Sequence, residues 1–454
     1  MSEHVGRQAV VIGAGMGGLS AARALADHFE QVLVIENDAL PAEAAPRAGT
    51  PQCKQVHGLL MGGLQALESL FPGYEQASLQ AGAVPIQMSS EFRFEPPGYD
   101  PFPQRDLGVR ILCMTRPLIE ATARKKAVLR GNISLRECCK AQEILVSEAG
   151  DVTGVRCAYG DGKTEDIAAD FVVDASSHGL LTLNLLTARG LPAPAENTIG
   201  VDIGYCTAMF EIPDDAPTGW KGTVVLPHPP HNRRGAFLIP VEGRRWTVTL
   251  AGRYADKPPD DEDGYFAFVR NLRTPTVHNA LKNAKRQSGF SRYGLKASRR
   301  RHFESVAAFP HGLLPFGDAI CRFNPIYGQG MSVAAKEACL LQGLLAAAFR
   351  EGGGINGLAA TFFAEAQKII ETPWSSSAIP DFLDPLTEGE RPPDLAQKLK
   401  SGAALTKAAA EDPAVHKVMM EVQHLLKPRS AYQEPEIAER IKAAMAAMTA
   451  AAAE

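Results

Sequence analysis

Three glycines near the N-terminus have the spacing of a dinucleotide-binding turn. Gly13, Gly15 and Gly18 form the pattern GxGxxG. They lie between an apolar, strand-like run at residues 8–12 and a helix-like stretch at residues 16–28. The glycines permit a tight turn and a close approach of the backbone to a pyrophosphate, and the N-terminus of the helix offers free N–H groups and positive dipole charge. The sequence therefore predicts a βαβ unit that binds a dinucleotide.

An acidic residue follows at the distance that this motif requires. The second apolar strand is expected at residues 32–36 and ends in Glu36, roughly 20 residues after the first glycine. A carboxylate there accepts hydrogen bonds from a ribose 2'-hydroxyl. Because strand, helix and acid are in register, the pattern favours dinucleotide binding over a fortuitous glycine turn. FAD and NAD fit it equally well.

The overall composition excludes several function classes. The chain has 454 residues, 45% of them hydrophobic, and a net charge of -4, so we expect more than one packed unit and no nucleic-acid partner. The eight cysteines include no CxxC pair, and we expect no metal site. The sequence begins without a secretory signal pattern, and no apolar run reaches the roughly 20 residues of a membrane helix. We therefore expect a cytoplasmic protein without integral membrane association.

A second glycine-rich segment lies far from the first. It reads LPFGDAICRFNPIYGQG over residues 314–330, between a strand-like stretch and a long helix-like stretch at about residues 330–349. A loop that opens a long helix presents positive dipole charge, which stabilises negative charge on a reduced flavin. An ordinary strand-turn-helix connection gives the same pattern. The segment therefore indicates a cofactor site only when it is considered together with the first motif.

This second segment resembles the GD motif of the FAD-dependent monooxygenases built like para-hydroxybenzoate hydroxylase. The resemblance decides for FAD as the cofactor. It implies that Gly317 and Asp318 lie at the ribityl or ribose hydroxyls of FAD. It also implies that the following loop faces the isoalloxazine with the residues Pro325, Gly328, Gln329, Gly330 and Met331.

Further segments resemble a narrower branch of that family, which includes epoxidases acting on polyether-precursor polyenes. They are PRAGTPQCKQVHGLLMGGLQALESLFPG at residues 46–73, MTRPLIE at residues 114–120, and FVVDASSHG continuing to VDIGY at residues 171–205. The likeness spans most of residues 8–350 and weakens in the C-terminal part.

The narrower resemblance assigns roles to single residues. It implies cofactor contacts for Arg47, for Arg116 and for Asp174 at the end of a strand. It also brings the segment of His57 past the cofactor, which makes His57 a candidate catalytic residue. A structural histidine would fit beside a glycine and a leucine equally well.

Two departures from related enzymes bear on the reaction. Related hydroxylases carry an Asp-Gly pair and a downstream Arg associated with FAD and NADPH, but here Asp174 is followed by ASSHG. We therefore expect FAD to be reduced by NAD(P)H directly or through a separate flavin reductase. The WxWxIP signature of flavin halogenases is missing, since the comparable strand reads GAFLIPV at residues 235–241, and this disfavours halogenation.

The expected fold class is α/β. It comprises a Rossmann-like FAD-binding domain of the glutathione reductase type, an inserted antiparallel β-sheet as the substrate domain, and C-terminal helices. The discontinuous FAD-binding domain is expected at residues 1–75, 107–180 and 295–370, the substrate-binding domain at residues 76–106 and 181–294, and the helical region at residues 371–454. Within these parts we expect a helix over residues 56–71, and solvated strand edges or turns at the arginine run 299–301.

The preferred function is an FAD-dependent monooxygenase. Its substrates would be molecular oxygen and a hydrophobic, secondary-metabolite molecule that is epoxidised or hydroxylated through a flavin C4a-hydroperoxide. The cofactor then carries the chemistry, so no catalytic triad is required. One alternative is an FAD-dependent reductase that saturates isoprenoid-type double bonds. Another is a non-enzymatic binding protein like the GDP dissociation inhibitors, although a protein without FAD has no ribose for Glu36 and Asp318 to hold.

Overall fold

A five-stranded parallel sheet forms the base of one half of the molecule. The structure is a computed structural model that describes residues 4–352 and 354–451. The strand order is β17 (Leu313–Pro315), β11 (Phe171–Asp174), β1 (Gly6–Ile12), β2 (Phe29–Ile35) and β7 (Ile133–Arg136). Because all neighbours are parallel, the carboxyl ends of the strands meet at one edge. Four sequence features lie at the ends of these strands and so converge at that edge. They are the glycine motif after β1, Glu36 after β2, Asp174 at the end of β11 and the GD motif after β17.

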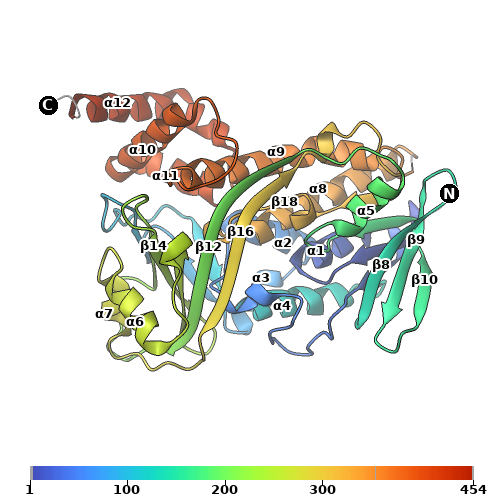
Figure 1. The fold of residues 1–454 in the computed structure, drawn as a ribbon, viewed down its shortest axis with the longest axis horizontal. Helices are drawn as coiled ribbons and strands as arrows, with labels where there is room; N and C mark the ends of the chain where they lie inside the picture. The colour runs from blue at the N-terminus through green and yellow to red at the C-terminus, as the bar shows by residue number, and fades with distance from the viewer. Residues whose placement is uncertain (1–3, 353, 452–454) are drawn as a thin grey trace.

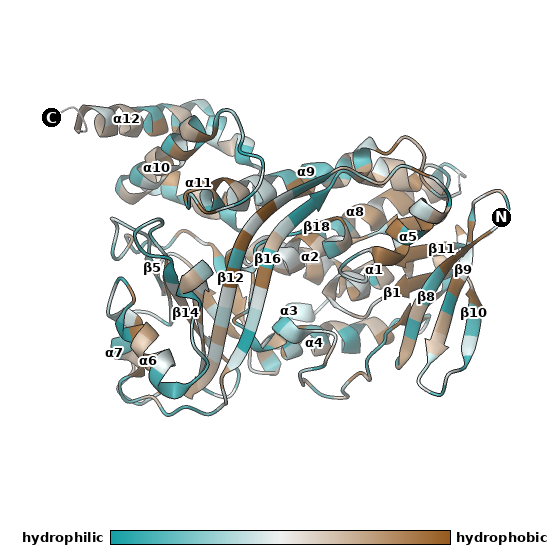
Figure 2. Ribbon diagram, viewed as in Figure 1, coloured by the Kyte–Doolittle hydropathy of each residue, from teal (hydrophilic) through white to brown (hydrophobic). Residues whose placement is uncertain are grey.

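Both faces of this sheet are covered, which explains the continuous apolar runs of its central strands. Val11 and Val34 pack on the helical side, whereas Val10 and Ile35 pack against the other side. The helical side carries α1 (Met16–Leu25), α2 (Met61–Leu70), α4 (Arg116–Val128) and α8 (Gly330–Arg350). The antiparallel meander β8 (Cys139–Val146), β9 (Val152–Tyr159) and β10 (Thr164–Ala168) covers the other side. Figure 2 shows hydrophobic colouring on β1 and β11.

A seven-stranded sheet forms the second half. Its order is β18 (Cys321–Arg322), β16 (Ser291–Arg301), β12 (Glu196–Glu211), β15 (Arg245–Arg253), β14 (Arg234–Val241), β13 (Gly222–Val225) and β5 (Phe92–Glu95). The neighbours are antiparallel except for β13 and β5, which are parallel. The long, curved strands β12 and β16 run from this sheet back to the FAD-binding half (Figure 1).

The two faces of the large sheet have different partners. One face, with Cys206 and Phe210, packs against α6 (Glu262–Arg270) and α7 (Thr276–Leu281). The other face, with Ile203, Tyr205 and Leu295, belongs to the core of the FAD-binding half. The alternation of side chains along β12 thus gives the sheet one structural face and one face toward the cofactor domain.

The remaining elements complete the two halves. A small antiparallel sheet contains β3 (Gly58–Leu59), β6 (Arg110–Cys113) and β4 (Val84–Gln87), and two short helices are α3 (Tyr74–Gln80) and α5 (Leu180–Ala188). The C-terminal helices are α9 (Leu358–Asp381), α10 (Leu395–Glu411), α11 (Pro413–Gln423) and α12 (Pro435–Ala451). The last three share a core with Phe102 from the loop after β5.

Some elements differ from the sequence expectations. Residues 56–71 form β3 and then α2 instead of one helix, because Gly58 and Leu59 pair with β6. The expected domain boundary at residues 294/295 falls inside β16, and the one at residues 370/371 falls inside α9. These boundaries cut continuous elements because the sheet and the helix are shared by adjoining parts of the molecule.

Helix α8 is long and apolar enough, by length and composition, to cross a membrane. In the structure it packs against α1, α2 and α9. Residues including Val333, Ala338 and Leu341 on its inner face are buried. The apolar composition of α8 is accounted for by its place in the core of the FAD-binding half, since a core helix needs the same side chains.

Candidate cofactor and active site

The three glycines of the first motif differ in their steric surroundings in the turn between β1 and α1. Gly13 has a φ of +101°, and a Cβ on it would lie 2.9 Å from the carbonyl oxygen of Ala175. A Cβ on Gly18 would lie 1.8 Å from the carbonyl oxygen of Gly13. A Cβ on Gly15 would meet no heavy atom of the described residues within 4 Å. The turn itself therefore requires Gly13 and Gly18, whereas Gly15 borders open space.

The N-terminus of α1 suits an anion. Gly15 caps the helix without a side-chain hydrogen bond, and the first turn contains no acidic residue. The first N–H groups of a helix have no acceptor within the helix and carry positive dipole charge. Open space at Gly15 lets a pyrophosphate reach these groups, as the dinucleotide-binding motif requires.

Glu36 lies beside this turn and is held in place. Its carboxylate accepts hydrogen bonds from the backbone N–H groups of Ala14, at 2.8 Å, and Asp38, at 3.1 Å. The guanidinium of Arg47 lies 3.2 Å from it. The carboxylate is thereby fixed beside the glycine turn, and its hydrogen bond to an adenosine ribose stays a prediction.

Arg47 links the strand β2 region to α4. Its guanidinium contacts Glu36, Asp38 at 3.0 Å and Glu120 at 2.7 Å, and the side chain is buried. Three carboxylates compensate this one positive charge, so Arg47 orients Glu36. A direct contact of Arg47 with the cofactor stays a prediction.

Arg116 has a hydrogen-bonding capacity that the protein does not use. Its Nη2 lies 3.1 Å from the Glu120 carboxylate, while Nη1 is buried without a hydrogen-bond partner among the described residues. An unsatisfied buried donor costs about 1–3 kcal/mol. A phosphate or ribose oxygen would remove that cost, which supports the cofactor role expected for Arg116.

The GD motif reaches the same edge after β17. Gly317 has a φ of +61°. The Asp318 carboxylate lies next to Gly330, since a Cβ on that glycine would be 3.8 Å from Asp318 Oδ1. Burial raises the pKa of Asp318, and the charges of Arg322 and Arg116 oppose this rise. No donor of the described residues hydrogen-bonds to this carboxylate, so it is available to the hydroxyls of a ribityl chain.

Glu337 lies beneath the GD motif and was not identified from the sequence. It is completely buried, and its Oε2 accepts a hydrogen bond from the Gly317 N–H at 3.0 Å. Burial raises the pKa of Glu337 to about 8, so the carboxyl is largely protonated at neutral pH. The sequence did contain a signal for its burial. Glu337 lies four residues after Val333 and four before Leu341, on the same apolar face of the helix.

The loop after the GD motif, residues 325–330, leads into the N-terminus of α8. Gly328 has a φ of +66° and ends a short 3-10 turn that begins at Pro325. Gln329 caps α8 without a side-chain hydrogen bond, and its Oε1 is buried without a partner among the described residues. Free helix N–H groups and an unpaired amide suit the polar edge of a flavin ring. Gly330 and Met331 are the first residues of the helix, as expected for this loop.

A buried network fixes this loop to the end of α9. The Asp381 carboxylate accepts hydrogen bonds from Arg253 on β15, from Asn324 at 3.1 Å and from the Tyr327 hydroxyl at 3.1 Å. Burial raises the pKa of Asp381, and Arg253 opposes this rise. Tyr205 on β12 donates to Asn324 at 3.4 Å. We call Asp381, Arg253, Asn324 and Tyr327 the Asp381 network; it joins residues that are far apart in the sequence.

His57 is held against the large sheet. Its Nδ1 lies 2.9 Å from the carbonyl oxygen of Gln55, which can only accept, so Nδ1 carries the proton. Gln55 in turn accepts from Thr207 at 2.5 Å. Burial and the charge of Arg116 lower the pKa of His57 to about 4. His57 is therefore a neutral imidazole at physiological pH.

Asp174 has a role within the protein that the sequence did not indicate. Its Oδ1 accepts from the N–H of Ser176 at 3.2 Å and from the Ser176 hydroxyl at 2.5 Å. Its Oδ2 accepts from the N–H and the hydroxyl of Thr182, at 3.1 and 2.7 Å. These four hydrogen bonds occupy the completely buried carboxylate, so Asp174 shapes the loop beside Gly13. Direct contact with the cofactor stays a prediction for this residue.

Comparisons with known proteins place the chain in a family. The FAD binding domain family matches residues 7–372. Protein Rv3254 of Mycobacterium tuberculosis is 31% identical over 82% of this chain and 80% of its own length. Squalene epoxidase 4 of Arabidopsis thaliana is 25% identical over 74% of this chain and 61% of its own length.

Solved structures share the fold at low sequence identity. The flavin-dependent brominase Bmp2 matches with a TM-score of 0.68 and 14% identity, over 98% of this chain and 99% of that one. The p-nitrophenol 4-monooxygenase PnpA of Pseudomonas putida matches with a TM-score of 0.62 and 18% identity, over 93% and 99% of the two chains. Identities at this level establish the fold and carry no substrate across. This chain belongs to the FAD binding domain family and is an FAD-dependent oxidoreductase with the fold of the flavin monooxygenases.

Proposed function

We propose that this protein inserts one atom of molecular oxygen into a hydrophobic, secondary-metabolite substrate, and that the reaction is epoxidation of an alkene. When bound, FAD supplies the oxygen-activating redox chemistry. The residues of this chain hold the cofactor, position the substrate and exclude water. Glu36, Arg116 and Asp318 would hold the ribose, phosphate and ribityl groups.

The proposal is carried by the apolar and aromatic character of the large sheet on the side that faces the cofactor domain. Ile203, Tyr205 and Leu295 are buried there in one core with residues of the FAD-binding half. The rings of Tyr205 and Tyr293 stack with centroids 6.3 Å apart. Apolar and aromatic side chains favour a hydrophobic ligand and keep water from the reaction. The identity with squalene epoxidase 4 supports an alkene as the reacting group.

The low basicity of His57 favours epoxidation over hydroxylation of a phenol. Hydroxylation of a phenol is assisted by a base that accepts the phenolic proton. With a pKa of about 4, His57 is a weak base. The hydroxyls of Thr207 and Thr249 on the same sheet face hydrogen-bond to each other at 2.6 Å. Oxygen transfer to an alkene requires no such base.

The test follows the fate of oxygen-18. The FAD-loaded protein is incubated under 18O2 with squalene or p-nitrophenol, and is supplied either with NADPH alone or with NADH and a flavin reductase. An epoxide that contains one 18O atom supports the proposal. A product of p-nitrophenol carrying 18O, with none from squalene, would replace epoxidation by aromatic hydroxylation. A product that has gained two hydrogens and no oxygen would establish the reductase alternative instead. The two electron supplies show whether NADPH acts directly.

A further inference from the structure

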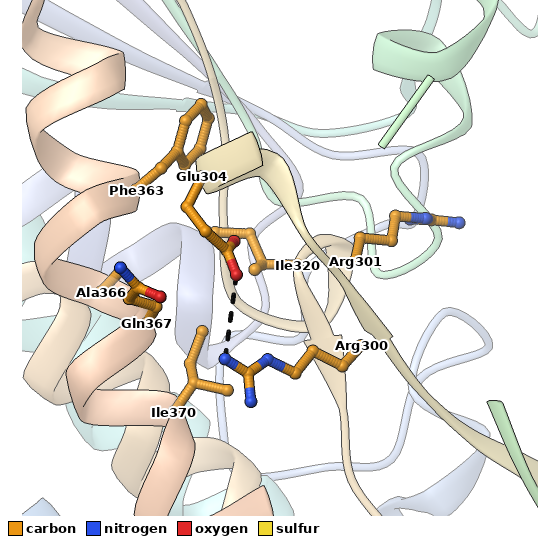
Figure 3. Close-up of a pocket in the computed structure, with 8 residues that line it drawn as sticks. All are labelled: Arg300, Arg301, Glu304, Ile320, Phe363, Ala366, Gln367 and Ile370. Carbon is orange, nitrogen blue, oxygen red and sulfur yellow. Dashed lines mark ion pairs between the residues drawn. The ribbon is translucent and has the colours of Figure 1, made fainter. Parts of the chain in front are cut away.

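A small void lies between β16 and α9, at the arginine run 299–301. Its volume is about 10 Å³, the room of one water molecule. Figure 3 shows the Arg300 guanidinium directed toward Glu304, at 3.9 Å. Arg300 also lies 2.6 Å from Glu371 on α9, and Arg301 is almost completely buried. The run is therefore not the solvated strand edge that the sequence suggested, and the void has no room for a ligand.

A much larger groove lies on the outer face of the large sheet, the face that carries α6 and α7. It is formed by β12, β16 and the loop after β15, and its volume is about 280 Å³, close to the roughly 300 Å³ of the smaller ligand sites. Side chains alternate between the two faces of a strand. Gly294 and Lys296 therefore belong to the outer face, whereas Leu295 between them belongs to the core of the FAD-binding half. The sheet thus separates the groove from the side proposed for the substrate.

Three glycines on neighbouring strands form a row across this outer face. Gly204 on β12 is the register partner of Gly252 on β15 and of Gly294 on β16. A Cβ on Gly252 would lie 1.9 Å from the Asp256 carbonyl oxygen. A Cβ on Gly204 would lie 2.8 Å from Lys257 Cγ. The chain after β15 therefore folds onto two of the glycines, and this close approach explains why neither position carries a side chain.

Packing within the protein does not explain the third glycine, Gly294. A Cβ there would meet, among the described residues, only the Ile203 carbonyl oxygen at 3.4 Å. The backbone of Gly294 has no positive φ, and its pairing with Gly204 is regular. Glycine inside a strand weakens the strand, and it marks a bulge, a bend or the close approach of a backbone or a ligand. Because Gly294 is exposed, the last of these accounts for it.

Three basic side chains line the groove around Gly294. Arg292 and Lys296 flank this glycine on its own face of β16. Lys257, from the loop after β15, completes the set from the side of β12. The Arg292 guanidinium lies 3.3 Å from the Asp260 carboxylate, and the side chain remains more than half exposed. A guanidinium has five N–H donors, so Arg292 retains donors for a ligand.

A bulge in β12 supplies the carboxylate inside the groove. It places Asp202, whose φ is +34°, opposite Lys296. The Asp202 carboxylate lies 2.7 Å from Lys257 Nζ and 2.9 Å from Lys296 Nζ, and hydrogen bonds from these two lysines lower its pKa. One carboxylate thus serves two ammonium groups, so the lining keeps an excess of positive charge. A cleft lined by such an excess attracts anions.

We propose that this groove binds a small organic anion. Arg292 and Lys257 hold its carboxylate or phosphate group, and its body lies on the peptide planes at Gly294. The cations supply charge-assisted hydrogen bonds, whereas the missing side chain lets the ligand approach the backbone. The site goes beyond the proposed function, because it lies on the opposite face of the sheet from Tyr205 and Leu295 and takes neither FAD nor the oxygenated substrate.

The site is tested on the FAD-loaded protein by titration calorimetry with three probes. Benzoate and phenyl phosphate carry the two anionic groups on the same ring, and benzyl alcohol is the neutral analogue. One equivalent of an anion should bind, at least about tenfold more tightly than the alcohol. The anion that binds more tightly identifies the class of charged group. Equal affinities for the alcohol and the anions, or no binding of either anion up to about 10 mM, would overturn the proposal.

Variants then locate the bound anion. Arg292→Gln should weaken its binding about tenfold, because one charge-assisted donor is lost. Arg244→Gln is the matched control, since Arg244 is 65% exposed against 62% for Arg292 and likewise pairs with one aspartate, but lies outside the groove. Gly294→Ala should fold normally and weaken binding about fivefold or more, because its methyl group occupies the floor.

Gly289→Ala is the control for this second variant, because a Cβ on Gly289 also meets no heavy atom of the described residues within 4 Å. An anion affinity within twofold of the wild type in either Arg292→Gln or Gly294→Ala would place the anion elsewhere and overturn the site. Gly294→Ala keeps the test decisive if Arg292→Gln fails to fold, which circular dichroism reports. The titrations use neither oxygen nor an electron donor, so their outcome is independent of the oxygenation assay.

Discussion

Replacing Gly15 by alanine should separate cofactor binding from folding. The backbone at Gly15 has φ -73° and ψ -179°, which alanine adopts without strain. Its Cβ would meet no heavy atom of the described residues within 4 Å. The apoprotein should therefore be as stable as the wild type or about 0.4–1 kcal/mol more stable, because alanine restricts the unfolded chain. The same methyl group occupies the space that the pyrophosphate needs, so FAD binding should weaken by about 1–3 kcal/mol, or roughly 5- to 150-fold.

Gly18→Ala is the matched contrast, because it should destabilise the folded apoprotein. Its Cβ would lie 1.8 Å from the Gly13 carbonyl oxygen, so the turn must shift, at a cost of about 1–3 kcal/mol or more to the apoprotein. Urea unfolding of the apoproteins and FAD titration followed by flavin fluorescence give both quantities. If Gly15→Ala destabilises the apoprotein as much as Gly18→Ala, or binds FAD as tightly as the wild type, the assignment of Gly15 to the pyrophosphate site is wrong.

Three further changes test the residues around the cofactor. Asp381→Asn should lower the free energy of unfolding by about 3–5 kcal/mol, because it leaves the Arg253 charge buried and uncompensated; a loss below about 1 kcal/mol in urea unfolding would contradict the Asp381 network. The pKa of Glu337 is about 8 in the folded protein, against an ordinary value of 4.5. The folded state therefore binds the extra proton, and stability should fall as pH rises between these values, by on the order of 5 kcal/mol. Glu337→Gln should remove this fall, and parallel curves of unfolding free energy against pH for the two proteins would refute it. Glu36→Gln should weaken FAD binding about tenfold through its ribose contact, and an unchanged dissociation constant would exclude that contact.

The local chemistry of the cofactor site could be predicted from the sequence. The positive φ of Gly13 and the close approach of Gly18 to the Gly13 carbonyl oxygen arise within one turn, and the position of Glu36 follows from the length of one βαβ unit. The GD motif likewise lies in one continuous strand-loop-helix segment. Because such motifs depend on neighbours in the chain, their residue types and spacing are sufficient to identify them, and the parallel sheet then brings their ends to one edge.

Tertiary structure decided the contacts between distant segments. Asp381 meets Arg253 and Asn324 only because α9, β15 and the flavin loop pack together, and no spacing in the sequence encodes that meeting. Tertiary packing also turned Arg299 from an expected surface residue into a half-buried donor, two of whose nitrogens have no hydrogen-bond partner among the described residues. The sequence determined which groups are available, whereas burial and charge compensation, which are properties of the folded chain, determined which of them remain free to bind.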